Sequence, residues 1–187
     1  MLKKILLCLF SLFLIWQSHI QITGSLQHPV QSLWATVLVA FIINLYVTGA
    51  VAFPSFAFPI ERLFPDSYYK VTNSKRLKNV FKLMHVEGFR SFLLATFWRN
   101  KDQRNSFFDG TKAGIVNLER RSMNSEFGHL IALIVLVVIS VLFLIKGQVG
   151  LALLITLINV LGNLYPIILQ RHHRMRVSIM KRRMGFD

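Results

Sequence analysis

Four long apolar runs constrain this chain more than any other feature of its sequence. They cover about residues 5–22, 30–53, 128–145 and 149–169. Each run is close to the roughly 20 residues that an α-helix needs to cross the hydrocarbon core of a bilayer. Hydrophobic residues make up 53% of the chain, which is typical of a protein whose solvent is lipid. We therefore predict an all-α integral membrane protein, a single membrane domain over residues 1–187 with about four transmembrane helices.

The first run, "ILLCLFSLFLIWQSHIQI", resembles a signal peptide because Lys3 and Lys4 precede it. A signal peptide that is removed ends in a small-x-small cleavage site, whereas this run continues as "TGSL". We therefore expect the run to stay as a span. The single cysteine, Cys8, lies inside it, so no disulfide can form within the chain.

The basic residues predict the orientation in the membrane. If the N-terminus is inside, loops 23–29 and 146–149 lie outside, and residues 54–127 and 170–187 lie inside. Of the 22 lysines and arginines, only Lys146 then falls outside, as the positive-inside rule requires. We expect a multi-pass protein of the bacterial cell (inner) membrane with both termini in the cytoplasm.

The formal net charge is +14, which in a water-soluble protein would suggest nucleic acid as a partner. Here the basic residues flank the apolar runs, and the tail at 170–187 is the most basic part of all. Such a tail favours contact with anionic lipid headgroups. We expect lipid rather than nucleic acid as the partner of these charges.

Residues 54–127 separate the second span from the third and are rich in aromatic side chains. Disordered linkers lack such residues. The stretch "NSKRLKNVFKLMHVEGFRSFLLATFW" can be helical, but its apolar part is too short to span a bilayer. We predict a cytoplasmic interfacial or re-entrant helical segment, with a turn at Asp109–Gly110.

Two polar residues stand at the start of the third span. Glu126 and His129 are three positions apart, so they share one face of a helix. If the third and fourth spans form a hairpin about Gly147–Gln148, His129 comes level with Pro166. On the same count, Asn163 comes level with Ala132.

Further polar residues of the fourth span come to the same depth of the inner leaflet. Polar side chains at membrane depth usually face the protein interior and often mark a substrate or proton pathway. We predict one patch formed by Glu126, His129, Asn163, Gln170, Arg171, Arg174 and Arg176.

Each residue of this patch also has a purely structural interpretation. Glu126 can stabilise the positive end of a helix dipole, His129 can be an interfacial histidine, and Asn159 and Asn163 can join helices by hydrogen bonds. The Glu-x-x-His pair is also half of a di-iron signature. Since the sequence offers no second pair at that spacing, we expect no metal.

Four short motifs lie within roughly residues 60–183. The first is "RLFPDSYY", with Arg62, Pro65, Tyr68 and Tyr69. A second set comprises Glu87, Gly88, Phe97, Trp98, Arg99, Asp109 and Gly110. Glu126 and His129 follow, and the most specific block consists of Asn163, Gln170, Arg171, Arg174, Arg176 and Lys181–Arg183. Together these motifs resemble the glycosyl-4,4'-diaponeurosporenoate acyltransferase family.

The resemblance implies transfer of a fatty acyl group from a thioester, acyl-CoA or acyl-carrier protein, to a hydroxyl of a membrane (glyco)lipid. It implies no other cofactor. A histidine is the usual base for such a hydroxyl, so the expected catalytic residues are His129, Glu126 and Asn163. Glu126 is expected to orient His129. The residues expected to bind substrate or donor are Gln170, Arg171, Arg174, Arg176, Arg99, Trp98 and Glu87.

Two other functions remain open at this point. Small integral methyltransferases and reductases that act on lipids also place arginines, a glutamate and an asparagine near the cytoplasmic ends of their last helices. A non-catalytic scaffold or assembly protein could use the polar patch to dock a partner helix, and partners from the same pathway are compatible with either function.

Overall fold

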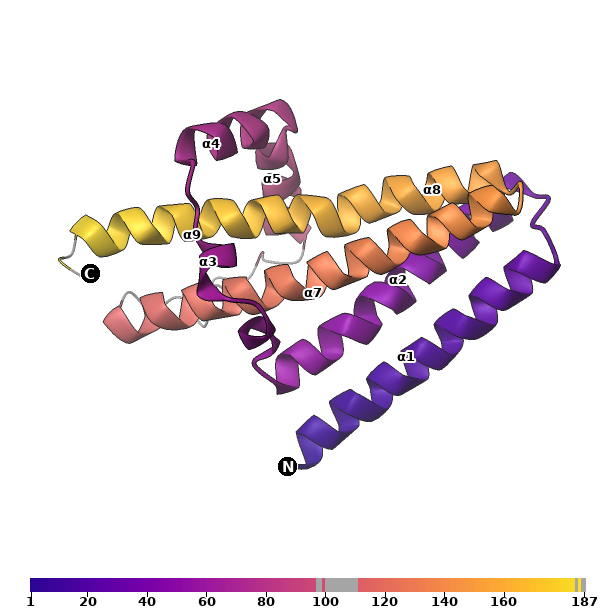
Figure 1. Cartoon of the computed structure of the whole chain (residues 1–187), viewed down its shortest axis with the longest axis horizontal. Coiled ribbons are helices and arrows are strands. Elements are labelled where there is room, and N and C mark those ends of the chain that lie inside the picture. The colour runs from indigo at the N-terminus through magenta and orange to yellow at the C-terminus, as the bar shows by residue number, and fades with distance from the viewer. Residues whose placement is uncertain (97–98, 100–110, 184, 186–187) are drawn as a thin grey trace. The chain divides into compact units, whose positions relative to one another are not determined.

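The computed structural model describes residues 1–96, 99, 111–183 and 185. Every regular element within these ranges is a helix (Figure 1). Among the described residues, four helices are long and apolar enough to cross a membrane, at Leu2–Gln27, Leu33–Ala57, Ala113–Ile145 and Val149–Arg182. The prediction of an all-helical membrane protein with four candidate spans is confirmed.

Contacts divide the chain into two compact units. The first, the hairpin unit, consists of Met1–Ile60 and Phe127–Leu164, and the second, the basic unit, consists of Glu61–Glu126 and Tyr165–Asp187. The expectation of one membrane domain stays a prediction.

In the hairpin unit, α1 (Leu2–Gln27) and α2 (Leu33–Ala57) run side by side in opposite directions (Figure 1). The buried polar residues of α1 recur every seven positions as Ser11, Ser18 and Ser25. Small residues let helices approach closely in a membrane, where water provides no hydrophobic drive. The hydroxyl of Ser11 donates to the Ala50 carbonyl at 2.6 Å, so the close approach is also hydrogen-bonded.

A tight turn joins α7 (Lys112–Ile145) to α8 (Val149–Asn159). The turn is a Schellman motif: the N–H of Gln148 donates to the Phe143 carbonyl and the N–H of Gly147 to the Leu144 carbonyl, both at 2.9 Å. Gly147 has a φ of 74°, a conformation that a glycine adopts without strain. The predicted hairpin about Gly147–Gln148 is therefore present.

The core of the hairpin unit lies where α2, α7 and α8 meet. Its buried side chains are aliphatic apart from one phenylalanine, and they interlock across the three helices: Ala40, Ile43, Val47, Leu136, Ile139, Phe143, Leu151, Ala152 and Ile155. Near this core the Ser140 hydroxyl donates to the Ala152 carbonyl at 2.8 Å. Close packing of this kind stabilises helix association in lipid.

The helix that follows α8 is interrupted by η2 (Val160–Leu164), a π-helical turn, before α9 (Tyr165–Arg183). Pro166 explains the interruption. Proline has no N–H to donate, and its ring clashes with the carbonyl four residues earlier. A π turn widens the helix and relieves that clash, and such turns are frequent at functional sites. Asn163 lies within this turn.

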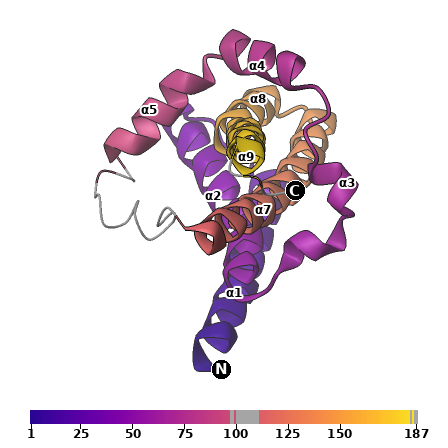
Figure 2. The same ribbon diagram turned by 90° about the vertical axis from the view of Figure 1, so that its left-hand side faces the viewer.

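In the basic unit, the short helices α4 (Ser74–Leu83) and α5 (Val86–Thr96) pack against α9 (Figure 2). The side chain of Asn73 caps α4 by accepting from the N–H of Arg76 at 2.8 Å. The helical backbone is interrupted at His85, which has a φ of 52°. The stretch expected to be helical is therefore two helices. The unit also contains α3 (Asp66–Tyr69), which follows η1 (Ile60–Leu63).

The third and fourth helices are longer than predicted. The third begins at Lys112 rather than at about residue 128, and the fourth continues beyond residue 169 to Arg183. Hydropathy ends where polar residues begin, but the helical backbone continues because no proline interrupts residues 112–145. The predicted turn at Asp109–Gly110 lies outside the described residues.

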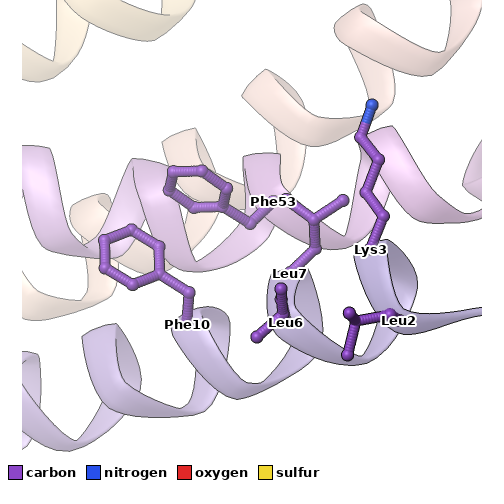
Figure 3. A pocket seen from close by; sticks show the side chains of 6 residues that line it. All are labelled: Leu2, Lys3, Leu6, Leu7, Phe10 and Phe53. Carbon is purple, nitrogen blue, oxygen red and sulfur yellow. The ribbon is translucent and has the colours of Figure 1, made fainter.

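An open apolar groove of about 560 Å³ lies between the start of α1 and the end of α2 (Figure 3). It is lined by Leu2, Lys3, Leu6, Leu7, Phe10 and Phe53. Lys3 is the only titratable side chain of this lining. The groove therefore offers apolar surface and one positively charged amine.

Candidate active site

The structure places most of the predicted site residues in two polar clusters, one in each unit. The cluster of the hairpin unit is centred on His129 of α7 and Asn163 of η2. The Nδ1 atom of His129 lies 2.9 Å from Oδ1 of Asn163, and Asn163 is 1% exposed. The predicted proximity of these two residues is therefore present as a direct hydrogen bond.

Asn163 has two further partners in the same cluster. Its Nδ2 atom donates to the Thr48 hydroxyl of α2 at 3.1 Å and to Oδ1 of Asn159 at 3.0 Å. Asn159 in turn donates from Nδ2 to the Leu133 carbonyl of α7 at 3.0 Å. Three helices thus hold the amide of Asn163, and through it the imidazole of His129.

The register of the hairpin differs from the predicted one. We expected His129 beside Pro166 and Asn163 beside Ala132, but His129 contacts Asn163 and the Asn159 side chain reaches Leu133. Counting outward from the turn treated both helices as regular. The capped turn and the π turn of η2 break that regularity, so the pairing is displaced by about one helical turn.

The cluster of the basic unit is centred on Glu126, which is fully buried. One carboxylate oxygen accepts from Nε of Arg171 at 2.8 Å, and the other forms an ion pair with Arg174. A buried carboxylate is tolerated when charge and hydrogen bonds satisfy it. Glu126 therefore has two cationic partners, both of them arginines of the predicted patch.

Arg174 uses all of its guanidinium nitrogens within the protein. Besides pairing with Glu126, it donates from Nη1 to the Ser122 hydroxyl at 3.1 Å and from Nε to the Tyr69 carbonyl at 3.4 Å. It is 3% exposed. Arg174 thus serves to hold the unit together. Arg171, by contrast, keeps 35% of its side chain exposed.

Two tyrosines of the "RLFPDSYY" motif lie against these arginines. The guanidinium of Arg171 is 4.9 Å from the ring centre of Tyr68, and that of Arg174 is 5.5 Å from the ring centre of Tyr69. Such cation–π contacts add to the ion pairs. Burial raises the pKa of Tyr69 to about 12, and the negative charge of Glu126 adds to that effect. Burial and Glu126 also raise the pKa of Tyr68.

Gln170 joins the same cluster through both its side chain and its backbone. Its Nε2 atom donates to the Ser125 hydroxyl at 3.3 Å, and its carbonyl accepts from the Ser122 hydroxyl at 3.1 Å. The side-chain amide thus has a protein partner. Ser122 and Ser125 of α7 thus both bind α9 at Gln170.

The remaining predicted binding residues lie on the surface. Glu87 is exposed and pairs with Arg90 at 2.5 Å. Arg99 and Arg176 are exposed, which leaves their charges in contact with the surroundings. Trp98 lies outside the described residues.

The sequence interpretation missed Glu61, which is buried and lies just before the "RLFPDSYY" motif. Its carboxylate accepts from Nε of Arg120 at 2.9 Å, its N–H donates to Oδ1 of Asn124 at 3.2 Å, and its carbonyl accepts from the Tyr69 hydroxyl at 2.9 Å. The proline-rich sequence around Glu61 has no helical or strand periodicity of apolar residues from which the burial of Glu61 could be inferred. A charged residue between aromatic side chains was the one available signal.

The cluster of the basic unit carries a net positive charge, because two guanidinium groups face one carboxylate. Arg171 is the member with exposed surface, and its planar group is suited to phosphate or carboxylate oxygens. The cluster of the hairpin unit is uncharged when His129 is neutral, and it offers an oriented imidazole. One cluster can therefore bind an anion and the other can accept a proton.

A protein-family model for glycosyl-4,4'-diaponeurosporenoate acyltransferase, CrtO, matches residues 65–183. The match covers more than half of the chain and includes the residues that carry the resemblance, except Arg62 at the start of the first motif. No curated protein matches the chain, and no solved structure matches it. The resemblance inferred from the sequence is confirmed, and the chain belongs to the glycosyl-4,4'-diaponeurosporenoate acyltransferase family.

Proposed function

We propose that this protein transfers a fatty acyl group from a thioester donor to a hydroxyl of a membrane (glyco)lipid, with His129 as the general base. The observation that carries the proposal is that the family match includes a histidine whose ring is fixed by a buried asparagine at 2.9 Å. A fixed imidazole is the group that general-base catalysis by a histidine needs.

In the proposed reaction the oxygen of the acceptor hydroxyl attacks the thioester carbonyl carbon. His129 takes the hydroxyl proton as the C–O bond forms. The tetrahedral intermediate collapses with cleavage of the C–S bond, and the thiolate leaves with the proton that His129 returns. General-base catalysis of this kind contributes about 10²–10⁴-fold to a rate.

We assign Glu126 a different role from the one expected from the sequence. Its carboxylate is bound by Arg171 and Arg174, which supports a role in positioning the half-exposed Arg171. Arg171 would bind an anionic group of the donor, such as the phosphates of acyl-CoA or of an acyl-carrier prosthetic group. The amides of Asn163 and Gln170 already donate within the protein, so we assign them to the positioning of neighbouring side chains.

The family and the four candidate spans make this a membrane protein. We propose that it lies in the cell membrane with both termini in the cytoplasm, because only Lys146 among the basic residues falls outside in that orientation. The test is a cysteine introduced at Lys146, an exposed residue of the turn between α7 and α8, in a Cys8→Ser background. A membrane-impermeant thiol reagent should label it in intact cells, and labelling only after lysis would reverse the orientation.

The activity is tested by lipid mass spectrometry of cells that carry the wild-type chain, the His129→Ala chain, the His28→Ala chain or none. We expect a lipid heavier by one fatty-acyl unit with the wild type and with His28→Ala, an exposed histidine at the end of α1. We expect its loss with His129→Ala.

Other outcomes point to other functions. A mass shift of one methyl group or of two hydrogens would favour a methyltransferase or reductase. Identical lipids in all four strains would favour a scaffold, and a stoichiometric partner should then co-purify. An acylated lipid that persists with His129→Ala would remove His129 as the base while leaving acyl transfer in place.

A further inference from the structure

We propose that Asn159 is a positioning residue that fixes the tautomer of His129, so that the neutral ring carries its proton on Nδ1 and its lone pair on Nε2. The proposal deepens the proposed function, in which His129 is the base. The tautomer itself can be measured without any activity, so the two proposals can fail separately.

The hydrogen-bond chain begins at a backbone carbonyl, which can only accept. Asn159 reaches the Leu133 carbonyl at 3.0 Å, so the atom of the Asn159 amide that faces this oxygen must be the Nδ2 donor. Its Oδ1 then faces the other way. The Leu133 carbonyl thus determines which atom is the donor and which the acceptor in each hydrogen bond of the series.

The orientation of the Asn159 amide determines the orientation of the Asn163 amide. Oδ1 of Asn159 can only accept, and it lies 3.0 Å from the amide of Asn163, so this atom of Asn163 must be the Nδ2 donor. Turning both amides over would place Oδ1 of Asn159 3.0 Å from the Leu133 carbonyl oxygen, with no hydrogen between two acceptors. Repulsion between them excludes that arrangement.

The last step of the chain reaches the imidazole. With its Nδ2 used by Asn159, Asn163 presents Oδ1 to Nδ1 of His129 at 2.9 Å. An amide oxygen only accepts, so Nδ1 must carry the proton. In a neutral imidazole the lone pair then lies on Nε2, which becomes the nitrogen that can take a proton from an acceptor hydroxyl.

Burial makes this chain a strong constraint. Asn159 and Asn163 are each 1% exposed, so water does not readily replace a lost partner, and an unpaired amide in such a place is costly. Thr48 is different in kind. Its hydroxyl can donate or accept, and it lies 3.1 Å from Nδ2 and 3.4 Å from Oδ1 of Asn163. Thr48 is therefore compatible with either orientation of the Asn163 amide, and Asn159 is the residue that determines this orientation.

The test is ¹⁵N NMR of histidine-labelled protein in lipid nanodiscs at a pH where His129 is neutral. The resonances of His129 are assigned by difference from a His129→Gln variant. We expect Nε2 to resonate as an unprotonated nitrogen and Nδ1 as a protonated one. A wild-type spectrum with the proton on Nε2 overturns the proposal without any further variant.

Three variants then separate positioning from folding. Asn159→Leu breaks the series of hydrogen bonds that leads to His129, and we expect part of the His129 population to carry its proton on Nε2. The kcat for acyl transfer should fall about tenfold or more, with little change in KM. Asn44→Leu removes another buried asparagine of the same unit, which donates to the Ala40 and Ile155 carbonyls, and should leave the tautomer unchanged. Thr48→Val should also leave it unchanged.

The outcomes are distinct. If Asn159→Leu folds and keeps the wild-type tautomer, or if Asn44→Leu shifts it equally, Asn159 does not set it. If the tautomer follows Asn159 but His129→Ala still acylates lipid, the positioning proposal stands and the assignment of the base fails.

Discussion

The carboxylate of Glu126 and the guanidinium of Arg174, 48 positions apart in the sequence, form an ion pair that is almost closed to the surroundings. Their side chains are 0% and 3% exposed. Two buried opposite charges of this kind depend on each other. The charge that remains after one partner is removed has no solvent to replace the partner.

Glu126→Gln is therefore expected to destabilise the protein strongly. Removing one partner of a buried ion pair typically costs about 3–5 kcal/mol, and here two arginines lose their counter-charge. Unfolding by SDS in mixed micelles measures the effect. The matched control is Glu87→Gln, which breaks the exposed pair with Arg90 and should change the free energy of unfolding by less than about 1 kcal/mol. Equal effects of the two substitutions would contradict the burial of Glu126.

Because the pKa of Tyr69 is raised in the folded protein, we expect a loss of stability at alkaline pH. Burial raises the pKa of its hydroxyl to about 12, whereas the unfolded chain has a pKa near 10. Between these values the unfolded state releases its proton first, so the contribution of Tyr69 is complete below about pH 10 and is lost as the pH rises toward 12.

Tyr69→Phe tests this dependence. The variant should be less stable at neutral pH by about 1 kcal/mol, because the hydrogen bond to the Glu61 carbonyl is lost. Its stability should then fall less steeply than that of the wild type from about pH 10 upward. Parallel pH profiles of the two proteins in this range would show that Tyr69 has no such linkage.

A side chain added at Gly49 would have to displace Leu14 where α1 packs against α2. A Cβ atom there would meet Cδ1 of Leu14 at 2.8 Å, whereas a Cβ atom at Gly150 of α8 would meet nothing within 4 Å. Gly49→Leu should therefore cost about 1–3 kcal/mol through overpacking, and Gly150→Leu should be neutral or stabilising. The two variants are compared in the same SDS unfolding assay, and a neutral Gly49→Leu would mean that the helices separate freely there.

Much of this architecture could be predicted from the sequence, because it depends on period and composition. Apolar runs of the right length define the four candidate spans, and the Glu126–His129 spacing marks the third of them. The pairing of Glu126 with arginines follows from the cost of a lone charge in a buried place. These inferences need only local chemistry.

Other features depend on contacts that no local pattern encodes. Residues 112–127 contain many polar and charged side chains, so hydropathy alone does not show that the helix of the third span begins as early as Lys112. The register between His129 and Asn163 depends on a π turn. The burial of Glu61 depends on how the proline-rich segment around it packs against the rest of the protein. Sequence spacing alone cannot supply these three-dimensional facts.

Arg171 and Arg174 share one carboxylate, yet their substitution should have different consequences. Arg174→Ala leaves Ser122, Tyr69 and Glu126 without their buried partner, and we expect a loss of folding. Arg171→Ala leaves Glu126 paired with Arg174, so the protein should fold. Because 35% of the Arg171 side chain is exposed, its loss should instead weaken the binding of an anionic donor.

Steady-state kinetics with acyl-CoA as the donor test the role of Arg171. A charge-assisted hydrogen bond contributes about 1.5–3 kcal/mol, so Arg171→Ala should raise the donor KM roughly tenfold or more while kcat changes little. Arg182→Ala, an exposed arginine of the same helix, is the matched control and should leave KM unchanged. A fall in kcat at constant KM would place Arg171 at the transition state rather than at the donor, since only interactions absent from the ground state act in that way.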